Sequence, residues 1–483
     1  MNYRLIFSNL GTVLGIEAVL MIPALLVSVI YGEDDVYVFL FSISVLVVAG
    51  FLLHLLKPKN SQMYARDGFA VVALSWFFIS LFGALPFLVS GAVSSPMDAF
   101  FESVSGFTTT GASILADVES LPRGILFWRS FTHWVGGMGV LALMLAVLPS
   151  VKPNNVHMLV AESPGPNPGK LVPKIRQTVK ILYLVYSGMT VTLIVLLIIS
   201  GMPVYDSVVH ALGTAGTGGF SIKNASIGAY SNEFAEVIIT VFMLLFGINF
   251  ALHYQAIRGN LKSYFRDAEF RFYLGAVLVS TVLIALDLTG KVSGSFPEAL
   301  RHSSFQVSSV ITTTGYSTTD FNLWPSFSKA ILVLLMFIGG SAGSTAGGMK
   351  CIRIVLLMKL VRREIHRIIH PRSVYPVRIN GKTVDEDVLS GVTVFFFAFI
   401  CIFAVALLIV SAEGKDMISN FTAVTACIGN IGPGLGIVGP LGNFSSYSVL
   451  SKAVFSFCMI AGRLEIFPIL LLFAPTFWKK VNI

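Results

Sequence analysis

Residues 98–111 read Asp-Ala-Phe-Phe-Glu-Ser-Val-Ser-Gly-Phe-Thr-Thr-Thr-Gly, and residues 302–315 read His-Ser-Ser-Phe-Gln-Val-Ser-Ser-Val-Ile-Thr-Thr-Thr-Gly. Two related stretches, 206–219 and 419–432, also end at a glycine. Each stretch is too short to cross a bilayer and lies between two apolar segments of membrane length. Four such loops can close a ring of carbonyl oxygens around one axis. Such a ring is how a protein replaces the water shell of a monovalent cation.

The composition is that of a polytopic membrane protein. The chain has 483 residues, of which 55% are hydrophobic and only 12% are charged, whereas soluble domains carry about 25% charged residues. The first apolar stretch, Asn9 to Tyr31, is too long for a signal peptide and lacks a small-residue cleavage site, so we take it as the first span. The apolar segments predict an all-α protein with ten transmembrane helices, near 8–31, 36–56, 69–92, 125–150, 177–201, 234–257, 272–289, 327–360, 387–412 and 447–478.

The formal net charge of +8 orients the chain in the membrane. Most lysines and arginines fall in the connectors on one side, and the positive-inside rule makes that side cytoplasmic. Both termini are then expected in the cytoplasm, and all four glycine-ended loops outside. Because the positive charge is accounted for in this way, nothing in the sequence calls for a nucleic-acid partner.

The same parts recur between successive glycines: a span, an outer loop, a second span and a basic inner connector. This is an internal repeat of pattern with little identity. We expect four span–pore-loop–span repeats in a pseudo-four-fold arrangement, preceded by a two-helix unit. The predicted units are 1–60 for the helix pair, then 61–176, 177–270, 271–382 and 383–483 for repeats 1 to 4.

The loops have the chemistry of a potassium filter. Irregular backbone at membrane depth must be buried in protein or line water, and a short helix aimed inward points its negative C-terminal end at a cation. Glycine reaches the backbone angles that turn carbonyl oxygens toward an axis. The alternative is that these are ordinary turn or helix-packing glycines. The predicted K+-binding residues are Thr109, Thr110, Gly111, Gly218, Gly219, Thr313, Thr314, Gly315, Asn430, Ile431 and Gly432.

The span after the third loop contains a run of small residues. Because each glycine costs a helix about 1 kcal/mol relative to alanine, a break at membrane depth is expected there, and Gly136-Gly137 and Gly247 to Asn249 are less interrupted. A break below the third loop would lie in the permeation path and act as a gate, whereas close helix packing through small residues is the alternative. The predicted gate is Gly339, Gly340, Ser341, Ala342, Gly343, Ser344, Thr345, Ala346, Gly347 and Gly348, together with Arg463.

Arg463 lies deep in the last span, where a charge is costly unless it is paired or faces water. It either faces the pore below the filter and repels cations, or forms a structural ion pair between repeats or subunits. Glu465, two positions on, projects from another side of a helix and is not assumed to be its partner.

Other polar residues give no sign of an enzyme. Four acidic residues near the outer mouth either concentrate cations or cap pore helices: Asp98, Glu102, Asp206 and Asp320. The scattered histidines lack metal-ligand spacing and are expected in polar contacts: His133, His210, His253 and His302. The cysteines lie in apolar segments and are expected to be buried: Cys351, Cys401, Cys427 and Cys458.

The loop motifs resemble a known family. Thr-Thr-Thr-Gly-Ala (108–112), Gly-Gly-Phe-Ser (218–221), Thr-Thr-Thr-Gly-Tyr-Ser-Thr (312–318) and Asn-Ile-Gly-Pro-Gly (430–434) look like the four filter loops of the Trk/Ktr/HKT superfamily of potassium transporters. The similarity covers about residues 65–480, and the extra N-terminal helix pair resembles the TrkH branch. A glycine in every loop implies potassium preference. The second loop lacks the triple threonine, which leaves its register open by one residue.

The resemblance implies a bacterial inner-membrane protein whose substrate is the potassium ion, with no organic cofactor. It further implies an intramembrane gating loop, Arg463 in the pore constriction, a homodimer and a TrkA-like cytosolic nucleotide-binding ring as partner. The basic run from Lys359 to Lys382 is then either an orientation signal beside anionic headgroups or a docking face for that regulator. The alternatives are a potassium transporter coupled to Na+ or H+, which predicts inverted repeats, and a membrane enzyme or structural scaffold.

Overall fold

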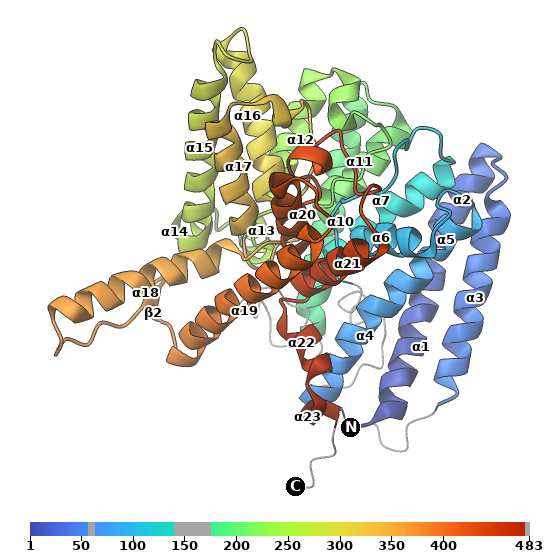
Figure 1. The fold of residues 1–483 in the computed structure, drawn as a ribbon, viewed down its shortest axis with the longest axis horizontal. Coiled ribbons are helices and arrows are strands. Elements are labelled where there is room, and N and C mark those ends of the chain that lie inside the picture. Colours follow the sequence, from blue (N-terminus) through green and yellow to red (C-terminus); the bar gives the residue numbers. More distant parts are fainter. Residues whose placement is uncertain (57–62, 140–174, 479–483) are drawn as a thin grey trace.

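The computed structural model describes residues 1–56, 63–139 and 175–478, and these ranges are almost entirely helical (Figure 1). Their regular strands form one antiparallel ribbon, β1 (Arg378–Ile379) and β2 (Lys382–Thr383), in which Arg378 pairs with Thr383. The expected all-α membrane architecture is confirmed. The predicted boundary between residues 60 and 61 lies outside the described residues.

The N-terminal unit consists of α1 (Tyr3–Leu20), α2 (Ile22–Tyr31) and α3 (Val36–His54). Helices α1 and α3 cross closely at two glycines, because a Cβ on Gly11 would lie 2.6 Å from the Gly50 carbonyl oxygen. The outer face of α3 exposes large apolar side chains, among them Phe41, Val48 and Phe51. Such a face is suited to lipid rather than to water.

The first two repeats follow the expected order of long helix, short pore helix and second helix. Repeat 1 contains α4 (Ala65–Gly83), α5 (Leu85–Val89), pore helix α6 (Pro96–Phe107) and α7 (Arg123–Gly137). Repeat 2 contains α10 (Ile175–Ile199), pore helix α11 (Val204–Gly216), η2 (Ser226–Tyr230), α12 (Glu233–Phe246), α13 (Phe250–Ile257) and α14 (Lys262–Arg266).

The last two repeats keep the same order. Repeat 3 contains α15 (Ala268–Leu288), pore helix α16 (Phe296–Ile311), η3 (Phe321–Leu323), α17 (Ser326–Ile338) and α18 (Cys351–Ile369). Repeat 4 contains α19 (Glu386–Ser411), pore helix α20 (Met417–Gly429), η4 (Gly436–Val438), α21 (Val449–Arg463), α22 (Phe467–Phe473) and α23 (Pro475–Trp478).

Long apolar helices account for some of the ten expected spans. Within the described ranges six helices are long and apolar enough to cross a membrane, or seven if the bent pair α12–α13 is one span. Two of the remaining three predicted spans are interrupted second helices, and the third lies partly outside the described residues. Span 327–360 is split between α17 and α18, span 447–478 is split between α21 and α22, and span 125–150 is described only as far as residue 139.

Helix breaks are more general than the sequence analysis expected. Helices α12 and α13 meet at an angle of 100°, so the segment from Gly247 to Asn249 is a sharp break. In repeat 4, Glu465 and Ile466 both adopt positive φ after α21. A glycine is needed at this break, since a Cβ on Gly247 would lie 2.7 Å from the Tyr273 hydroxyl. The expectation that only repeat 3 is strongly interrupted was therefore wrong.

Three apolar clusters hold the repeats together. One joins the N-terminal unit to repeats 1 and 4, and two others lie largely within repeats 2 and 3. The start of α1 and helix α23 lie at the same end of the molecule, while α18 and the β-ribbon project from one side (Figure 1). Three cysteines are buried as expected, but Cys401 is exposed on α19, so the prediction was wrong for that residue.

Candidate functional site

The four loops share one backbone conformation. Each pore helix is followed, within two residues of its end, by a residue with left-handed φ, and a glycine with positive φ lies two positions later. The left-handed residues are Thr109 (φ 55°), Thr217 (54°), Thr313 (55°) and Asn430 (54°), and the glycines are Gly111 (78°), Gly219 (78°), Gly315 (85°) and Gly432 (96°). In each loop the amide between them donates to a carbonyl five residues back: Thr110 to Ser105 (2.9 Å), Gly218 to Gly213 (2.9 Å), Thr314 to Ser309 (2.8 Å) and Ile431 to Ala426 (2.9 Å).

These loops meet in a closed ring. A Cβ added to any of the four glycines would contact a carbonyl oxygen of the next loop, at 2.7 Å in the case of Gly432. The contacts run around the ring from Gly111 to Gly218, from Gly219 to Thr314, from Gly315 to Ile431 and from Gly432 to Thr110. A side chain at these positions would push two loops apart, which gives glycine a steric as well as a conformational role.

The ring settles the register of the second loop. Gly219 has the φ and the neighbour of the other three glycines, whereas Gly218 matches Thr110, Thr314 and Ile431. Thr217, which the sequence analysis left out of the site, then occupies the left-handed position. The signal that could have found it is the offset of two residues between a polar residue and the glycine in every loop.

Loop hydroxyls tie the ring to its surroundings. The Thr108 and Thr110 hydroxyls lie 2.8 Å apart, and the Thr312 and Thr314 hydroxyls repeat that spacing. In the fourth loop the Asn430 amide donates to the Thr110 hydroxyl at 3.0 Å and to the Met459 carbonyl at 2.9 Å. The side chains of Thr109, Thr110, Thr313, Thr314, Asn430 and Ile431 are all fully buried.

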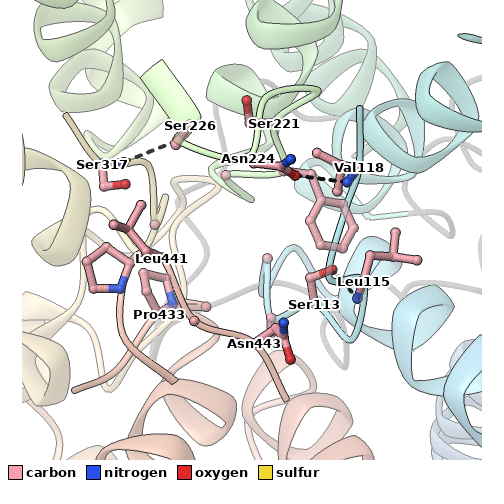
Figure 2. Close-up of a pocket in the computed structure, with 18 of the residues that line it drawn as sticks. Ser113, Leu115, Val118, Ser221, Asn224, Ser226, Ser317, Pro433, Leu441 and Asn443 are labelled. Atoms are coloured by element: carbon pink, nitrogen blue, oxygen red, sulfur yellow. Dashed lines mark hydrogen bonds between the residues drawn. The ribbon is translucent and has the colours of Figure 1, made fainter. Parts of the chain in front are cut away.

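A cavity adjoins the ring, and we call it the outer cavity because the charge pattern of the sequence predicts that the loops lie outside. It has a volume of about 140 Å³ and is lined by residues of all four loops, including the four ring glycines (Figure 2). On its wall Asn224 accepts from the Val118 amide at 2.9 Å and Lys223 pairs with Glu119 at 2.9 Å. That hydrogen bond from Lys223 lowers the pKa of the Glu119 carboxyl. The first and second loops are therefore joined on their outer side.

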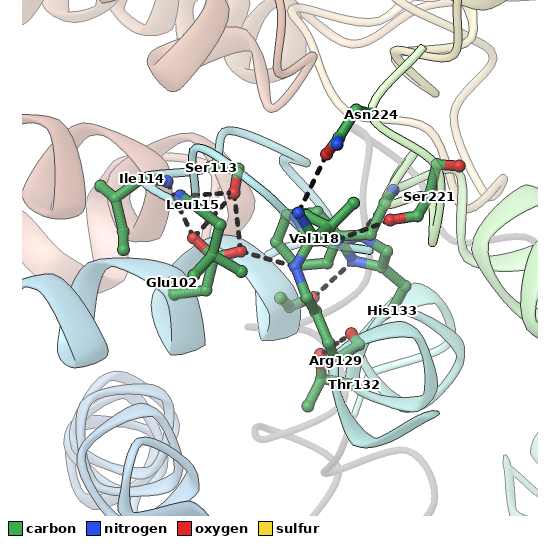
Figure 3. Close-up of polar contacts among 12 residues, drawn as sticks. Glu102, Ser113, Ile114, Leu115, Val118, Arg129, Thr132, His133, Ser221 and Asn224 are labelled. Carbon is green, nitrogen blue, oxygen red and sulfur yellow. Dashed lines mark hydrogen bonds and ion pairs between the residues drawn. The ribbon is translucent and has the colours of Figure 1, made fainter. Parts of the chain in front are cut away.

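A buried ion pair joins the same two loops behind the ring. Arg129 on α7 donates from Nε to Glu102 on α6 at 2.6 Å and from Nη1 to the Ser221 carbonyl at 3.0 Å. Glu102 also accepts from the Ile114 amide at 3.0 Å, and the Arg129 guanidinium lies 3.5 Å from the centre of the Phe220 ring. Figure 3 shows these contacts converging between the loops.

The acidic residues differ from expectation. Glu102 is fully buried in its ion pair, so it neither caps a helix nor lies open to solvent at the mouth. Asp98 pairs with Lys452 of α21 at 2.6 Å, and Asp206 accepts from the Tyr230 hydroxyl at 2.7 Å. Asp320 does cap, but the helix is η3 rather than a pore helix.

All four histidines that the sequence analysis considered have hydrogen-bond partners, as expected. His133 lies 2.8 Å from the Gly106 carbonyl and accepts from the Phe220 amide at 3.2 Å, which fixes the second loop against α6. His210 contacts the Ser221 hydroxyl at 2.9 Å. Among the described residues no cluster of three or more His, Cys, Asp or Glu side chains could hold a metal ion.

The interruption in repeat 3 is a non-helical segment of turns and bends from Gly339 to Lys350. Gly339, Gly343, Gly348 and Lys350 all adopt positive φ, which a helix cannot contain. The segment lies against the third loop, because the Gly347 amide donates to the Thr313 hydroxyl at 2.6 Å. The predicted break is thus present, and its position beside the ring is as expected.

Several contacts hold this segment from other repeats. The Ser341 amide donates to the Gly247 carbonyl at 2.9 Å, and the Thr345 hydroxyl donates to the Phe246 carbonyl at 3.2 Å. The Ala342 amide donates to Glu269 of α15 at 2.7 Å. Segment 339–350 is therefore attached to repeat 2 and to its own repeat at once.

Arg463 bridges three repeats through backbone carbonyls. From the end of α21 its guanidinium donates to Thr345 of the interruption at 2.9 Å, to Gly137 at 2.7 Å and to Gly136. Glu465 forms its ion pair with Arg353 of α18. Nothing in the sequence indicated that Glu465 is the partner of Arg463, and the structure agrees. The structure thus brings Arg463 and the predicted gate segment together.

Comparisons with known proteins decide the family. A family model described as TrkH, cation transport protein, matches residues 36–480. The chain belongs to the TrkH family. It is 38% identical to the Trk system potassium uptake protein TrkH of Salmonella typhimurium, over 99% of this chain and 100% of that protein. It is 34% identical to the Trk system potassium uptake protein TrkG of Escherichia coli over 99% of each chain.

A solved structure supports the same assignment. The crystal structure of the potassium transporter TrkH from Vibrio parahaemolyticus matches with a TM-score of 0.89 and 36% identity, over 99% of this chain and 100% of that one. Membership of the TrkH family agrees with the multi-pass helical architecture and with the resemblance seen in the loop motifs. It also favours transport over the enzyme alternative, since these relatives are transporters.

Proposed function

We propose that this TrkH-family chain takes up potassium ions through the ring of four loops, in the manner of a channel. The closure of the ring by Gly111, Gly219, Gly315 and Gly432 is the observation that carries the proposal. Each pore helix ends at the ring, so four negative helix ends favour a cation there. The printed names of the Salmonella and Escherichia relatives, both potassium uptake proteins, support potassium as the substrate.

We propose that ions enter from the outer cavity and lose water at the ring. Thr110, Gly218, Thr314, Ile431 and the ring glycines are the residues whose carbonyl oxygens are available to replace that water. The inside-negative membrane potential would draw each ion inward with about 2.3 kcal/mol per 100 mV.

Flow is controlled, in this proposal, by segment 339–348 and Arg463 below the ring. The segment is in contact with the third loop through Thr313 and with Arg463 through Thr345. It is rich in glycine and lacks helical hydrogen bonds, so it can change conformation at less cost than a helix. A guanidinium at this depth would also repel cations while the segment is closed.

The setting of the protein is proposed from the charge pattern and the family. We place it in the bacterial inner membrane with both termini in the cytoplasm, which agrees with the start of α1 and helix α23 lying at one end of the molecule. A homodimer with one pore per chain and a TrkA-like cytosolic nucleotide-binding partner complete the proposal. The word "system" in the relatives' names is consistent with more than one component.

Potassium rescue of a transport-deficient bacterium tests the function. Cells carrying the wild type should grow at low potassium, whereas Gly111→Ser and Gly315→Ser should lose discrimination of potassium over sodium, since each places a side chain against the next loop. Serine at Gly391, where a Cβ meets nothing within 4 Å, is the matched control. Unchanged ion preference in both ring variants would overturn the proposal.

The coupled transporter is distinguished by flux in proteoliposomes. With the potassium gradient fixed, channel-type uptake should not depend on a sodium or proton gradient. A flux that follows either gradient at constant voltage would favour coupling. The growth experiment tests the filter and the flux experiment tests the mode of transport, so failure of the filter and failure of the channel mode can be told apart.

A further inference from the structure

A second cavity lies far from the ring, between α18 and the segment that leads into the β-ribbon. Its volume is about 310 Å³, at the lower end of the range of about 300–1,000 Å³ typical of ligand pockets. Its lining residues are Lys359, Arg362, Tyr375, Pro376, Val377 and Arg378. Three of these six are cationic, and none is acidic.

The charges in this cavity are not neutralised by the protein. Within the described ranges neither Arg362 nor Arg378 forms an ion pair, and the Lys359 ammonium donates only to the Arg378 carbonyl, at 2.8 Å. By contrast Arg363, one position further along α18, pairs with Glu386 at 2.6 Å. Three like charges facing one cavity repel one another unless an anion lies between them.

The cavity has fixed walls. Val377 is buried in a small apolar cluster with Leu356 of α18 and Leu389 of α19, and its carbonyl accepts from the Val384 amide at 2.9 Å. The Tyr375 ring lies 4.8 Å from that of His366 on α18. The two guanidiniums are therefore carried by elements that are held in place before any ligand binds, which lowers the entropy lost on binding.

We propose that this cavity binds a phosphate ester, and that the ester belongs to the headgroup of an anionic glycerophospholipid. Guanidinium groups match phosphate oxygens in paired hydrogen bonds, and a nearby ammonium adds a point charge. Basic pockets of membrane proteins on the cytoplasmic side bind such headgroups. This inference does not depend on the proposed filter or gate.

The apolar side of α18 favours a lipid over a soluble phosphate compound. Met358, Val361 and Ile365 recur at helical spacing, and each exposes at least half of its side chain. Val361 is the immediate neighbour of Arg362, so acyl chains lying along this stripe would place a headgroup near the cavity.

Lipid retention by the purified full-length protein tests the site. Binding of phosphatidylglycerol would be measured by native mass spectrometry, with phosphatidylcholine as the neutral comparison. The cavity variant Arg362→Gln/Arg378→Gln should bind phosphatidylglycerol at least about 10-fold more weakly, because each basic residue contributes about 1 kcal/mol near an anionic lipid. The variant Arg362→Lys/Arg378→Lys keeps the charge and should bind with intermediate affinity.

The matched control removes two charges from the same region outside the cavity, as Arg367→Gln/Arg372→Gln, and should retain the lipid. Equal weakening in both double variants would mean that the basic run acts as a diffuse surface charge, and would overturn the site. Absence of phosphatidylglycerol preference in the wild type would overturn it as well.

Glycerol phosphate is the soluble probe. If it binds the wild type as tightly as the lipid does and fails to bind the cavity variant, the phosphate site stands and its ligand is a soluble phosphate ester.

Discussion

The Glu102 carboxylate accepts a 2.6 Å hydrogen bond from Arg129 Nε inside the protein, and both side chains are buried. Glu102 also accepts from the Ile114 amide, just beyond Gly111, and Arg129 donates to the Ser221 carbonyl, just beyond Gly219. One ion pair therefore holds the segments that follow Gly111 and Gly219 in two neighbouring loops. The spacing between Gly111 and the second loop depends on this connection.

Arg129→Gln should destabilise the protein strongly. It leaves the Glu102 carboxylate buried without its cation, and breaking a buried pair in this way costs about 3–5 kcal/mol. The midpoint of thermal unfolding of the purified protein is the measurement, and the exposed arginine variant Arg372→Gln, in which no buried pair is broken, is the comparison. A midpoint equal to that of the wild type would contradict the finding that this pair is structural.

The double variant Glu102→Gln/Arg129→Gln separates stability from ion selection. Removing both charges should restore much of the stability, because no unpaired buried charge is left. Discrimination of potassium over sodium should stay impaired, because the bond from Arg129 to the Ser221 carbonyl is lost. Wild-type discrimination in a well-folded double variant would show that the pair does not position the loops.

Thr217→Asn should stabilise the protein by about 1 kcal/mol while preserving transport. A β-branched residue is strained in the left-handed region, where Asn is better tolerated, and the equivalent position of the fourth loop is already Asn430. Thr217→Gly is the control for backbone strain without a side chain. If the midpoint of thermal unfolding falls in both variants, the register with Gly219 in the ring is wrong.

Much of this arrangement could be read from the sequence, because its determinants are local. The glycines at 111, 315 and 432 follow polar residues at a fixed offset, and the apolar flanks dictate re-entrant loops. The second loop was harder, since Thr214 to Gly219 contains three glycines and no triple threonine. Its positive φ and its contact with the Thr314 carbonyl, both visible only in the structure, distinguish Gly219 from its neighbour.

The parts that sequence reasoning missed depend on distant partners. Glu102 and Arg129 lie on different helices, and nothing in their local pattern indicates that they form a buried pair. The 100° break between α12 and α13 likewise lies where two distant residues, Tyr273 and Thr312, leave no room for a Cβ on Gly247. Helix propensity alone could locate the glycine-rich break in repeat 3 but not this one.

Deleting residues 341–346 should raise basal potassium flux. The deletion removes the bond from Ser341 to repeat 2, the bond from Ala342 to Glu269 of its own repeat and the bond from Arg463 to Thr345. The space beneath the third loop is then no longer filled. Arg463→Ala removes the bond between Arg463 and Thr345 while leaving the segment intact, and it should also raise basal flux. Unchanged or lower flux in the deletion variant, at normal expression in proteoliposomes, would contradict the gate.

Potassium removal should lower the thermal stability of the purified protein. The ring brings carbonyl oxygens of four loops together, and without a cation these partial negative charges repel one another. A ligand that binds only the folded state adds about 2.7 kcal/mol to the free energy of unfolding when its concentration is 100 times its Kd. The unfolding midpoint should therefore be higher in potassium than in sodium or choline.

Gly219→Ser, whose side chain would collide with the Thr314 carbonyl, should lose this potassium-specific increment. Gly391→Ser, which meets no neighbour within 4 Å, should keep it. Identical midpoints in the three salts would mean that the four glycines close a structural ring and not an ion-binding one.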